Sequence, residues 1–376
     1  MRIGFDGRYI QDRYHGIGRY AFELLRHLVI QQPNDQFIVI WNNKLPNTRF
    51  DLGGLLHNPH VLAVPTKVPL FSPWDQVWLP RLARRMGLDL FHVPYFAVPV
   101  LLACPLVITV HDLIFDRYPL YMPHRWARGY YTMMMHLGLQ RAKGVAVVSE
   151  ATKRDLFTYY RGIDAHIAVT PEAVNEHYRP ASRERIAAIS TKYGLPRRYV
   201  LCVGVRRPHK NIGVIVEALG QLREEVPHAL VLAGGVDRRF PDNLPALIEA
   251  NGLTGRVHDL GTIPESDLPA LYTGADVYLC TSLIEGFGLP VLEAFACGVP
   301  TIVSNRSALP EVADGAALLV DPVDSTSIAR ALRRILYDPA LARALSARGV
   351  ARARVYSWSR LAVQTHVLYS IATRHR

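Results

Sequence analysis

The sequence contains few of the residues that build disulfide frameworks or metal sites. Its four cysteines, Cys104, Cys202, Cys280 and Cys297, are widely spaced, and each lies in an apolar run. This distribution is typical of buried thiols in a reducing compartment rather than of a disulfide-stabilised secreted domain. The chain also has no CxxC or HExxH pattern. The cysteines and histidines therefore predict no structural or catalytic zinc.

Two further catalytic signatures are missing from the chain. There is no GxxxxGK[ST] segment and no GxSxG segment. The first absence argues against a P-loop nucleotidase, and the second against a hydrolase with a serine at a strand-to-helix elbow.

Long apolar segments are scarce as well. The chain starts with MRIGFDGRYI, which lacks the apolar core of a signal peptide. The longest apolar run, residues 96–110, is interrupted by Pro99 and Pro105 and is too short to cross a bilayer. We therefore expect a cytoplasmic protein, and its charge is compatible with a peripheral position at the inner membrane surface.

Lysine is rare, but the chain is strongly basic. Only six of its 43 basic residues are lysines, the net charge is +11 and the pI is near 9.6. This balance predicts anionic partners such as nucleotide diphosphates or acidic lipid headgroups. Nucleic acid is a weaker candidate, because the arginines are spread along the chain and no recognised binding module is present. We expect no nucleic-acid partner.

The length and the pattern of apolar segments predict two α/β domains. A chain of 376 residues is too long for one ordinary core. Continuous apolar strands alternate with amphipathic helices, which indicates parallel sheets covered on both faces. We place the first domain at residues 1–180, a polar linker at 181–197 and the second domain at 198–356. The expected strands span residues 2–5, 36–41, 60–64, 88–92, 106–110, 144–149, 167–170, 199–205, 229–234, 256–261 and 277–282, and a further strand and turn lie in TIVSNRSALPEV, residues 301–312. The expected helices include residues 17–30, 75–86, 125–143 and 325–337.

The most informative stretch is residues 277–300, VYLCTSLIEGFGLPVLEAFACGVP. A buried strand leads into a loop with Glu285, and a short helix starts at Pro290 and carries Glu293. Two glycines before free N–H groups at a helix start form an anion cradle. The two acids therefore lie on either side of a predicted phosphate site, which suits a nucleotide sugar. A plain strand–loop–helix unit, with Glu293 on a solvated face, is the alternative.

This stretch resembles the signature of the retaining glycosyltransferases of family 4. The resemblance covers essentially the whole chain and implies the GT-B fold, in which two Rossmann-like domains face each other. It implies that Glu285 contacts the transferred sugar and that Glu293 binds the donor ribose. It also implies that residues 357–376 return to the first domain, with a hinge near Tyr356. The backbone of Gly286, Phe287, Gly288 and Leu289 would bind the diphosphate.

In the first domain, two elements resemble parts of this family's site. HGIGRY carries Gly16, Gly18 and Arg19, and the resemblance implies a glycine loop that shapes the acceptor pocket. A tight turn into a helix is the alternative. His111 ends the strand PLVITV, at the strand end where ligands bind in such sheets. The family has a histidine here that meets the donor sugar and its phosphate, although a structural core histidine is the ordinary interpretation.

In the second domain, the loop RRPHKN follows the strand YVLCVGV. Many family members have an arginine directly after this glycine and a lysine five residues later. Here Val205 takes the arginine position, so we expect Lys210 and, in place of the missing guanidinium, Arg206 to bind the donor phosphates. The segment around Ile263 would contact the base through its backbone.

The resulting hypothesis is hexose transfer from a nucleotide diphosphate sugar, with retention at the anomeric carbon. His111, Glu285 and Lys210 are the expected catalytic residues. No DxD tripeptide is present, so we expect no metal and no cofactor, with cations and helix N-termini meeting the leaving-group charge.

Two short segments indicate the donor and the acceptor. RPHKN and GIGRY look most like bacterial mannosyltransferases of polysaccharide assembly, which implies GDP-mannose and a glycan or lipid-linked acceptor. UDP-glucose or another UDP-sugar is the alternative donor. A phosphorylase or synthase acting on a small sugar and a non-catalytic nucleotide-sugar-binding protein of the same fold are further alternatives.

Overall fold

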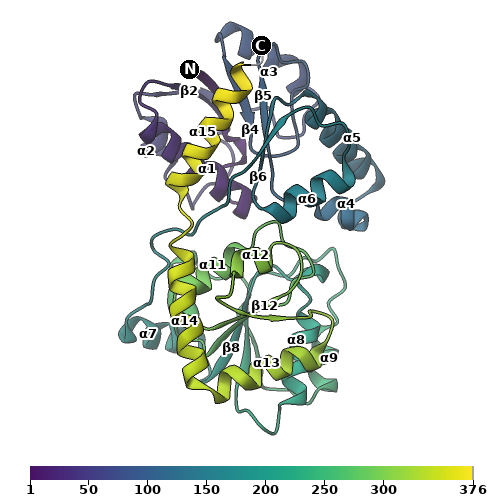
Figure 1. Ribbon diagram of the computed structural model, residues 1–376, viewed down its shortest axis with the longest axis vertical. Coiled ribbons are helices and arrows are strands. Elements are labelled where there is room, and N and C mark those ends of the chain that lie inside the picture. Colours follow the sequence, from purple (N-terminus) through teal and green to yellow (C-terminus); the bar gives the residue numbers. More distant parts are fainter. Residues whose placement is uncertain (375–376) are drawn as a thin grey trace. The chain divides into compact units, whose positions relative to one another are not determined.

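A computed structural model describes residues 1–374. The chain divides into two compact units (Figure 1). The first unit contains residues 1–172 together with the segment that begins at Ser357, and the second contains residues 173–356. The change of unit between Glu172 and Ala173 falls before the linker that was expected at residues 181–197.

The first unit is built on a seven-stranded sheet in the order β3-β2-β1-β4-β5-β6-β7, and all neighbouring strands are parallel. The five inner strands have apolar, buried interiors, as expected for a parallel sheet that is covered on both faces, whereas the two edge strands are only partly buried. The strands are β1 (Arg2–Asp6), β2 (Gln36–Trp41), β3 (Val61–Pro65), β4 (Leu90–Val93), β5 (Leu106–Val110), β6 (Gly144–Val147) and β7 (His166–Val169).

Helices connect these strands and cover the sheet. They are η1 (Gly7–Tyr9), α1 (His15–Gln31), α2 (Leu52–Leu56), α3 (Asp75–Arg85), α4 (Ile114–Arg117), η2 (Pro119–Tyr121), α5 (Arg125–Arg141), α6 (Glu150–Tyr159) and α15 (Trp358–Arg374). The predicted helices at 75–86 and 125–143 are confirmed within two residues. α1 begins at His15, however, two residues before the predicted start.

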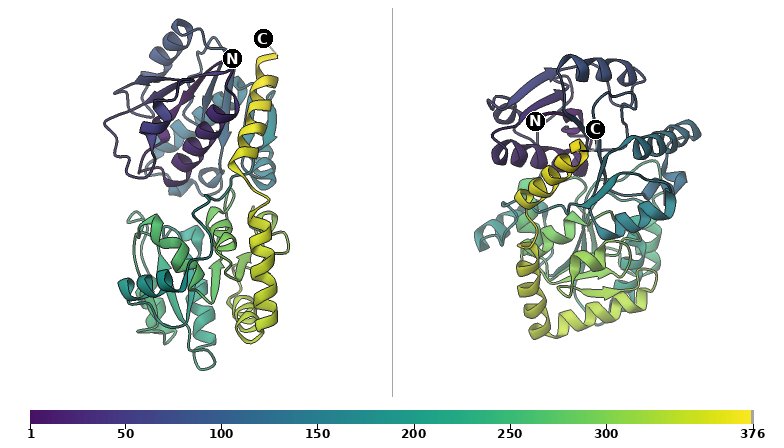
Figure 2. Two further views of the ribbon diagram at one scale, coloured as in Figure 1. Left: turned by 90° about the vertical axis from the view of Figure 1, so that its left-hand side faces the viewer. Right: turned by 45° about the horizontal axis from the view of Figure 1, so that its top comes forward.

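The last helix of the chain packs in the first unit, beside its first long helix (Figures 1 and 2). Gln31 on α1 donates a hydrogen bond to Ser359 at 2.6 Å. His366 of α15 lies 2.8 Å from Asp35, and the Tyr369 hydroxyl lies 2.6 Å from Nδ1 of His92 on β4. The predicted return of the C-terminal helix to the first unit is therefore confirmed.

The second unit has a six-stranded parallel sheet in the order β10-β9-β8-β11-β12-β13. Its strands are β8 (Tyr199–Val203), β9 (Ala229–Ala233), β10 (Val257–Asp259), β11 (Val277–Cys280), β12 (Thr301–Ser304) and β13 (Leu318–Val320). The edge strand β13 was not predicted, because three residues are too few for a periodic signal. Both sheets confirm the predicted pair of Rossmann-like α/β units.

The helices of the second unit include one in the expected linker. They are α7 (Arg183–Tyr193), η3 (Pro208–Lys210), α8 (Ile212–Gln221), α9 (Leu244–Ala250), η4 (Glu265–Asp267), α10 (Leu268–Thr273), α11 (Leu289–Ala296), α12 (Leu309–Ala313), α13 (Ser325–Tyr337) and α14 (Pro339–Ala353). Asp267 accepts hydrogen bonds from Arg185, Lys192 and Tyr193 of α7 at 2.6–2.7 Å. Residues 183–193 are therefore part of the second unit and not a free linker.

Parallel sheets place the loops that follow their strands at one edge, where ligands bind in open α/β folds. The loops after β8, β9, β10 and β11 share that edge in the second unit, and the loops after β1, β4 and β5 share it in the first. Among the helices in residues 1–374, none is long and apolar enough to cross a bilayer.

Candidate active site

The centre of the candidate site in the second unit is an ion pair between two neighbouring strand-end loops. Lys210 ends η3 after β8, and Glu285 lies in the loop after β11. The Lys210 Nζ donates a hydrogen bond to the Glu285 Oε1 at 2.5 Å. Both side chains are mostly buried, with exposed fractions of 20% and 12%. The structure therefore brings together the predicted phosphate-binding lysine and the predicted sugar-binding glutamate.

Backbone hydrogen bonds join these two loops directly. Leu283 N–H donates to the His209 carbonyl at 2.8 Å, and the Thr281 hydroxyl donates to the Asn211 carbonyl at 3.2 Å. Asn211 has the left-handed φ of 55°, which a short polar side chain tolerates. Its side-chain amide donates to the Pro322 carbonyl at 2.5 Å. These contacts fix the approach of Lys210 to Glu285.

The electrostatics of the pair favour two full charges. Burial by itself would lower the pKa of Lys210, but the charge and hydrogen bond of Glu285, together with Cys280 and Cys202, raise the pKa overall. Burial would likewise raise the pKa of Glu285, but the charge of Lys210, with a smaller contribution from His209, lowers it. Burial and the neighbouring Lys210 lower the pKa of His209 to about 4, so this imidazole is neutral at pH 7.

The predicted anion cradle lies at the start of α11. Gly288 has φ 111°, and a Cβ built there would lie 2.8 Å from Leu309. Only glycine suits this backbone. The helix then starts at Leu289 and continues with Pro290, which has no N–H, while Val291 and Leu292 donate to the Gly288 carbonyl at 2.9 and 3.4 Å. The N–H groups that precede this proline point out of the helix start. Phe287 is buried and packs edge-on against Tyr356, with ring centroids 5.4 Å apart.

Glu293 lies in the middle of α11 with an exposed fraction of 4%, so it does not lie on a solvated face. Its Oε2 accepts a hydrogen bond from the Tyr272 hydroxyl at 2.9 Å. Burial raises the pKa of this tyrosine well above its ordinary value, and the Glu293 charge adds to the effect. Tyr272 therefore remains a hydrogen-bond donor that orients Glu293. Sequence reasoning missed this residue, because 21 positions separate the partners.

Ser307 is a second residue that the sequence did not single out. Its hydroxyl donates to the Glu285 carbonyl at 2.7 Å, and the Glu285 N–H lies 3.3 Å from the same oxygen. Ser307 itself has the unusual φ of 57°. A strained residue that clamps the backbone of Glu285 is consistent with a functional loop.

Arg206, expected beside the donor phosphates, is held elsewhere. Its guanidinium pairs with Asp259 at 2.8 Å and with Asp242 at 3.6 Å. It lines a hollow of about 670 Å³ between α8, α9 and the loop after β9, together with Arg207 and Phe240. Lys210 does not line this hollow. The Arg206 guanidinium is therefore held by Asp259, the last residue of β10, and by Asp242 in the loop before α9, whereas Lys210 pairs with Glu285. Ile263 is partly exposed in the loop after β10.

In the first unit, His111 directly follows β5 and is 8% exposed. Its Nδ1 lies 3.2 Å from the Glu172 Oε1, and its Nε2 lies 3.0 Å from the Pro94 carbonyl. The Tyr20 ring meets the imidazole edge-on at 4.7 Å. Sequence reasoning proposed His111 but not Glu172, which lies 61 positions away.

A buried chain of hydrogen bonds lies beneath His111. The Tyr20 hydroxyl lies 3.0 Å from the Thr109 hydroxyl, which lies 2.9 Å from Nε2 of His92. The other ring nitrogen of His92 contacts Tyr369 of α15. The returning helix therefore supports the strand end that carries His111.

Gly16 was expected in a loop ahead of the first helix, but it lies inside α1, which starts at His15. Gly16, Gly18 and Arg19 all lie in the first turns of this helix. A Cβ on Gly18 would lie 3.0 Å from the Tyr9 carbonyl, so this glycine allows the helix start to approach η1. Nothing lies within 4 Å of a Cβ on Gly16. Arg19 is 8% exposed.

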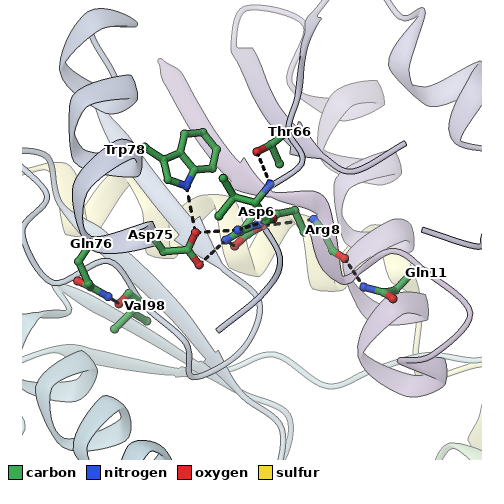
Figure 3. A network of polar contacts seen from close by, with 9 residues as sticks. Asp6, Arg8, Gln11, Thr66, Asp75, Gln76, Trp78 and Val98 are labelled. Atoms are coloured by element: carbon green, nitrogen blue, oxygen red, sulfur yellow. Dashed lines mark hydrogen bonds and ion pairs between the residues drawn. The ribbon is translucent and has the colours of Figure 1, made fainter. Parts of the chain in front are cut away.

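A second polar cluster lies at the end of β1 in the first unit (Figure 3). The Arg8 guanidinium binds Asp6 at 2.7 Å and Asp75 at 2.8 Å, and all three side chains are buried. Trp78 donates to the same Asp75 at 3.1 Å. A buried cation with two carboxylates joins β1 to α3 and neutralises the only acid of that helix.

Comparisons with known proteins show the family of the chain. The chain matches the family Glycosyl transferases group 1 over residues 185–352 and the family Glycosyltransferase Family 4 over residues 14–178. It is 30% identical over 387 residues to the O-antigen chain mannosyltransferase B of Escherichia coli, and the alignment covers 99% of this chain and 100% of that relative.

Two further similarities differ in their extent. The serotype-specific mannosyltransferase WbdA of Escherichia coli is 31% identical over 228 residues, which span 59% of this chain and 28% of that one. The solved structure of a sucrose-phosphate synthase from Thermosynechococcus elongatus superposes with a TM-score of 0.76 at 23% identity, over 98% of both chains. The last similarity concerns the fold.

Proposed function

The chain belongs to the family 4 glycosyltransferases, which carry the group 1 glycosyltransferase domain, and from this premise we propose its donor and its stereochemistry. It is a hexosyltransferase. The proposed reaction transfers mannose from GDP-mannose to a glycan or lipid-linked acceptor, with retention at the anomeric carbon. The observation that carries the proposal is the Lys210–Glu285 pair beside the α11 cradle, in a chain aligned over its full length with a mannosyltransferase.

The proposed donor site uses residues of the second unit in distinct roles. Lys210 and the N–H groups from Gly286 to Leu289 neutralise the diphosphate as charge develops on it. Glu285 accepts hydrogen bonds from hydroxyl groups of the mannose. Glu293, oriented by Tyr272, accepts hydrogen bonds from the ribose hydroxyls. The backbone around Ile263 contacts the base.

His111 is proposed to contact the transferred sugar and its phosphate. Its two ring contacts, with Glu172 and the Pro94 carbonyl, fix the plane of the imidazole. Gly16, Gly18 and Arg19 are proposed to shape the acceptor side. Because they lie in the first turns of α1, they would act through the N-terminus of this helix rather than as a loop.

The proposed chemical step forms one bond and breaks one. The bond between the anomeric carbon and the β-phosphate oxygen of GDP-mannose breaks, and the acceptor hydroxyl oxygen bonds to the same face of that carbon. The acceptor proton passes to the departing phosphate oxygen. The products are GDP and an α-mannoside, and no protein nucleophile is used.

We propose that the reaction needs no metal. Lys210 supplies a fixed positive charge beside the cradle, and a cation can serve a departing diphosphate in place of a divalent ion. Among residues 1–374, no group of three or more His, Cys, Asp or Glu side chains is placed to hold a metal ion.

Proton NMR of donor turnover tests donor and stereochemistry without a known acceptor. The protein is incubated with GDP-mannose or UDP-glucose, and the first free sugar released by water is observed before it mutarotates. We expect α-mannose from GDP-mannose, and a much smaller yield with Glu285→Gln. Initial β-mannose would refute retention. If only UDP-glucose is turned over, the proposed donor is UDP-glucose and not GDP-mannose. If both nucleotide sugars stay intact even when mannosyl acceptors are added, the result favours a non-catalytic binding protein.

A further inference from the structure

One surface of the first unit exposes large apolar side chains where charged residues are usual. Two of its helices, α3 and α5, together with the loop between β4 and β5, carry them. We call this surface the α3–α5 face. Its exposed apolar residues, with their exposed fractions, are Trp74 (69%), Val77 (38%), Leu101 (66%), Trp126 (78%), Met133 (50%) and Leu137 (36%).

These residues lie on the outer sides of elements that pack side by side. α3 and α5 bury their inner sides in one core, which includes Leu79, Ala83, Met134 and Leu139. The 98–101 loop lies against both helices. Gln76 of α3 donates to the Val98 carbonyl at 2.8 Å, and a Cβ on Gly138 of α5 would lie 3.0 Å from the Val98 side chain.

Helical spacing places the exposed residues of α5 in one stripe. Trp126, Met133 and Leu137 are seven and four residues apart, so they lie one above another along the helix. The opposite side of α5 is also apolar, because Tyr131, Met134 and Met135 are buried. The exposed apolar stripe of α5 is therefore not needed for packing in the core, which the opposite side of the helix provides. Exposed apolar surface of this kind marks an interaction site.

The charge on the same helices has one sign. α3 and α5 contain six arginines, Arg81, Arg84, Arg85, Arg125, Arg128 and Arg141, and a single acid, Asp75. Asp75 is buried and bound to Arg8 (Figure 3), so it offers no negative charge to a partner. The outer sides of both helices therefore combine apolar and positively charged groups without an exposed carboxylate.

We propose that the α3–α5 face docks on the surface of an anionic lipid bilayer. Tryptophan and long apolar chains enter the headgroup region, while arginines contact acidic headgroups. The positive charge of this face favours an anionic bilayer as the partner, because each basic residue near such a surface increases the binding affinity about fivefold. Docking on this face needs neither donor nor acceptor, so it is independent of the proposed function.

Sedimentation of the full chain with vesicles tests the proposal. The vesicles contain 30% phosphatidylglycerol in phosphatidylcholine, or phosphatidylcholine alone. We expect binding to the anionic vesicles at low salt, at least tenfold weaker binding to the neutral ones, and a loss of binding at 0.5 M NaCl. Equal binding to both vesicle types, or no binding, would overturn the proposal.

Paired variants assign the binding to this face. Trp74→Ala with Trp126→Ala should weaken binding at least tenfold, and Arg84→Gln with Arg125→Gln about 25-fold. The matched control is Ile30→Gln with Val367→Gln, because these residues are 66% and 53% exposed on α1 and α15. This control should bind like the wild type. Thermal melting of each variant shows whether it is folded.

Two other outcomes would refute the proposed occupant. If the tryptophan variants turn a dimer into a monomer without affecting vesicle binding, the face is a contact between copies of the chain. If the control variants lose vesicle binding and the paired variants keep it, docking uses another surface. Binding to bulk DNA as tight as binding to anionic vesicles would mean that the arginines select phosphate and not a bilayer.

Discussion

Lys210 and Glu285 are paired at 2.5 Å, although 75 positions separate them in the chain. The pair places a fixed cation where the diphosphate is proposed to leave and a fixed carboxylate where the sugar is proposed to bind. Preformed charges of this kind need no reorganisation during the reaction. The arrangement leads to the first prediction.

Removal of one partner of this pair should cost more stability than removal of both charges. Lys210→Ala leaves Glu285 mostly buried and uncompensated, which we expect to cost about 3 kcal/mol of the free energy of unfolding. Lys210→Met combined with Glu285→Gln should recover most of that loss, while both variants lose transfer activity. Urea denaturation measures the difference. If the single and the double variant are equally stable, the pair is not electrostatically coupled.

Glu172 should act on the reaction through His111. A carboxylate oxygen of Glu172 and the Pro94 carbonyl oxygen, both acceptors, lie at the two ring nitrogens of His111. Glu172→Gln should lower kcat by roughly 10–100-fold, since a hydrogen bond to a charged group contributes about 1.5–3 kcal/mol.

A purely structural role of Glu172 would give a different result. In that case Glu172→Gln would lower the melting temperature and leave the kcat of the folded protein unchanged. Nitrogen NMR of the His111 ring supplies the second readout. We expect the nitrogen resonance of Nδ1 to shift in the variant, while the nitrogen resonance of Nε2 stays in place.

Substitutions of Tyr272 and Glu293 should weaken donor binding without unfolding the protein. In Glu293→Gln the amide oxygen can still accept from the Tyr272 hydroxyl, so the fold should persist while ribose binding weakens. We expect calorimetry to show roughly tenfold weaker nucleotide binding, because the variant loses about one charge-assisted hydrogen bond to the ribose. Tyr272→Phe should give a smaller loss, because it frees Glu293 without removing it. If Tyr272→Phe weakens nucleotide binding more than Glu293→Gln does, the result would argue against ribose binding by Glu293.

The protein should lose stability in mild acid. Burial, with a contribution from His111, lowers the pKa of His92 to about 3, and burial with Lys210 lowers that of His209 to about 4. Below pH 6.5 the unfolded chain binds protons at these two histidines that the folded chain does not bind. The free energy of unfolding therefore decreases as the pH is lowered. Each residue contributes about 1.4 kcal/mol per pH unit until its folded pKa is reached.

Thermal melting between pH 8 and pH 4 measures this effect. The melting temperature should be flat above pH 7 and should fall steadily below pH 6. His209→Asn should reduce the slope of the acid branch, because one of the two titrations is removed. An unchanged slope in this variant would mean that His209 protonates without cost in the folded state.

Much of the fold could be predicted because its signals are local. Apolar runs such as residues 106–110 and 199–203 have to be buried on both faces, and the helix at 325–337 matches its prediction at both ends. The two-glutamate stretch also lies where expected, since a glycine and a proline fix the start of α11.

The remaining features depend on partners that are distant in the sequence. Arg206 is captured by Asp259, 53 positions away, and Glu172 reaches His111 across 61 positions. The family resemblance implies a glycine loop at HGIGRY, but the helix there starts already at His15, and Gly18 lets it pack closely against η1. No window of local sequence contains these contacts.

Calorimetric titration with GDP, UDP and ADP, with and without Mg²⁺, tests the central claim most directly, because it reads the proposed donor site without a known acceptor. The account predicts that GDP binds at least tenfold more tightly than UDP or ADP, that Mg²⁺ changes its affinity little, and that Lys210→Ala abolishes the binding. Preferential binding of UDP would contradict the GDP-mannose donor. Absence of binding to all three nucleotides would contradict the assignment of a nucleotide-sugar site to the loops after β8 and β11.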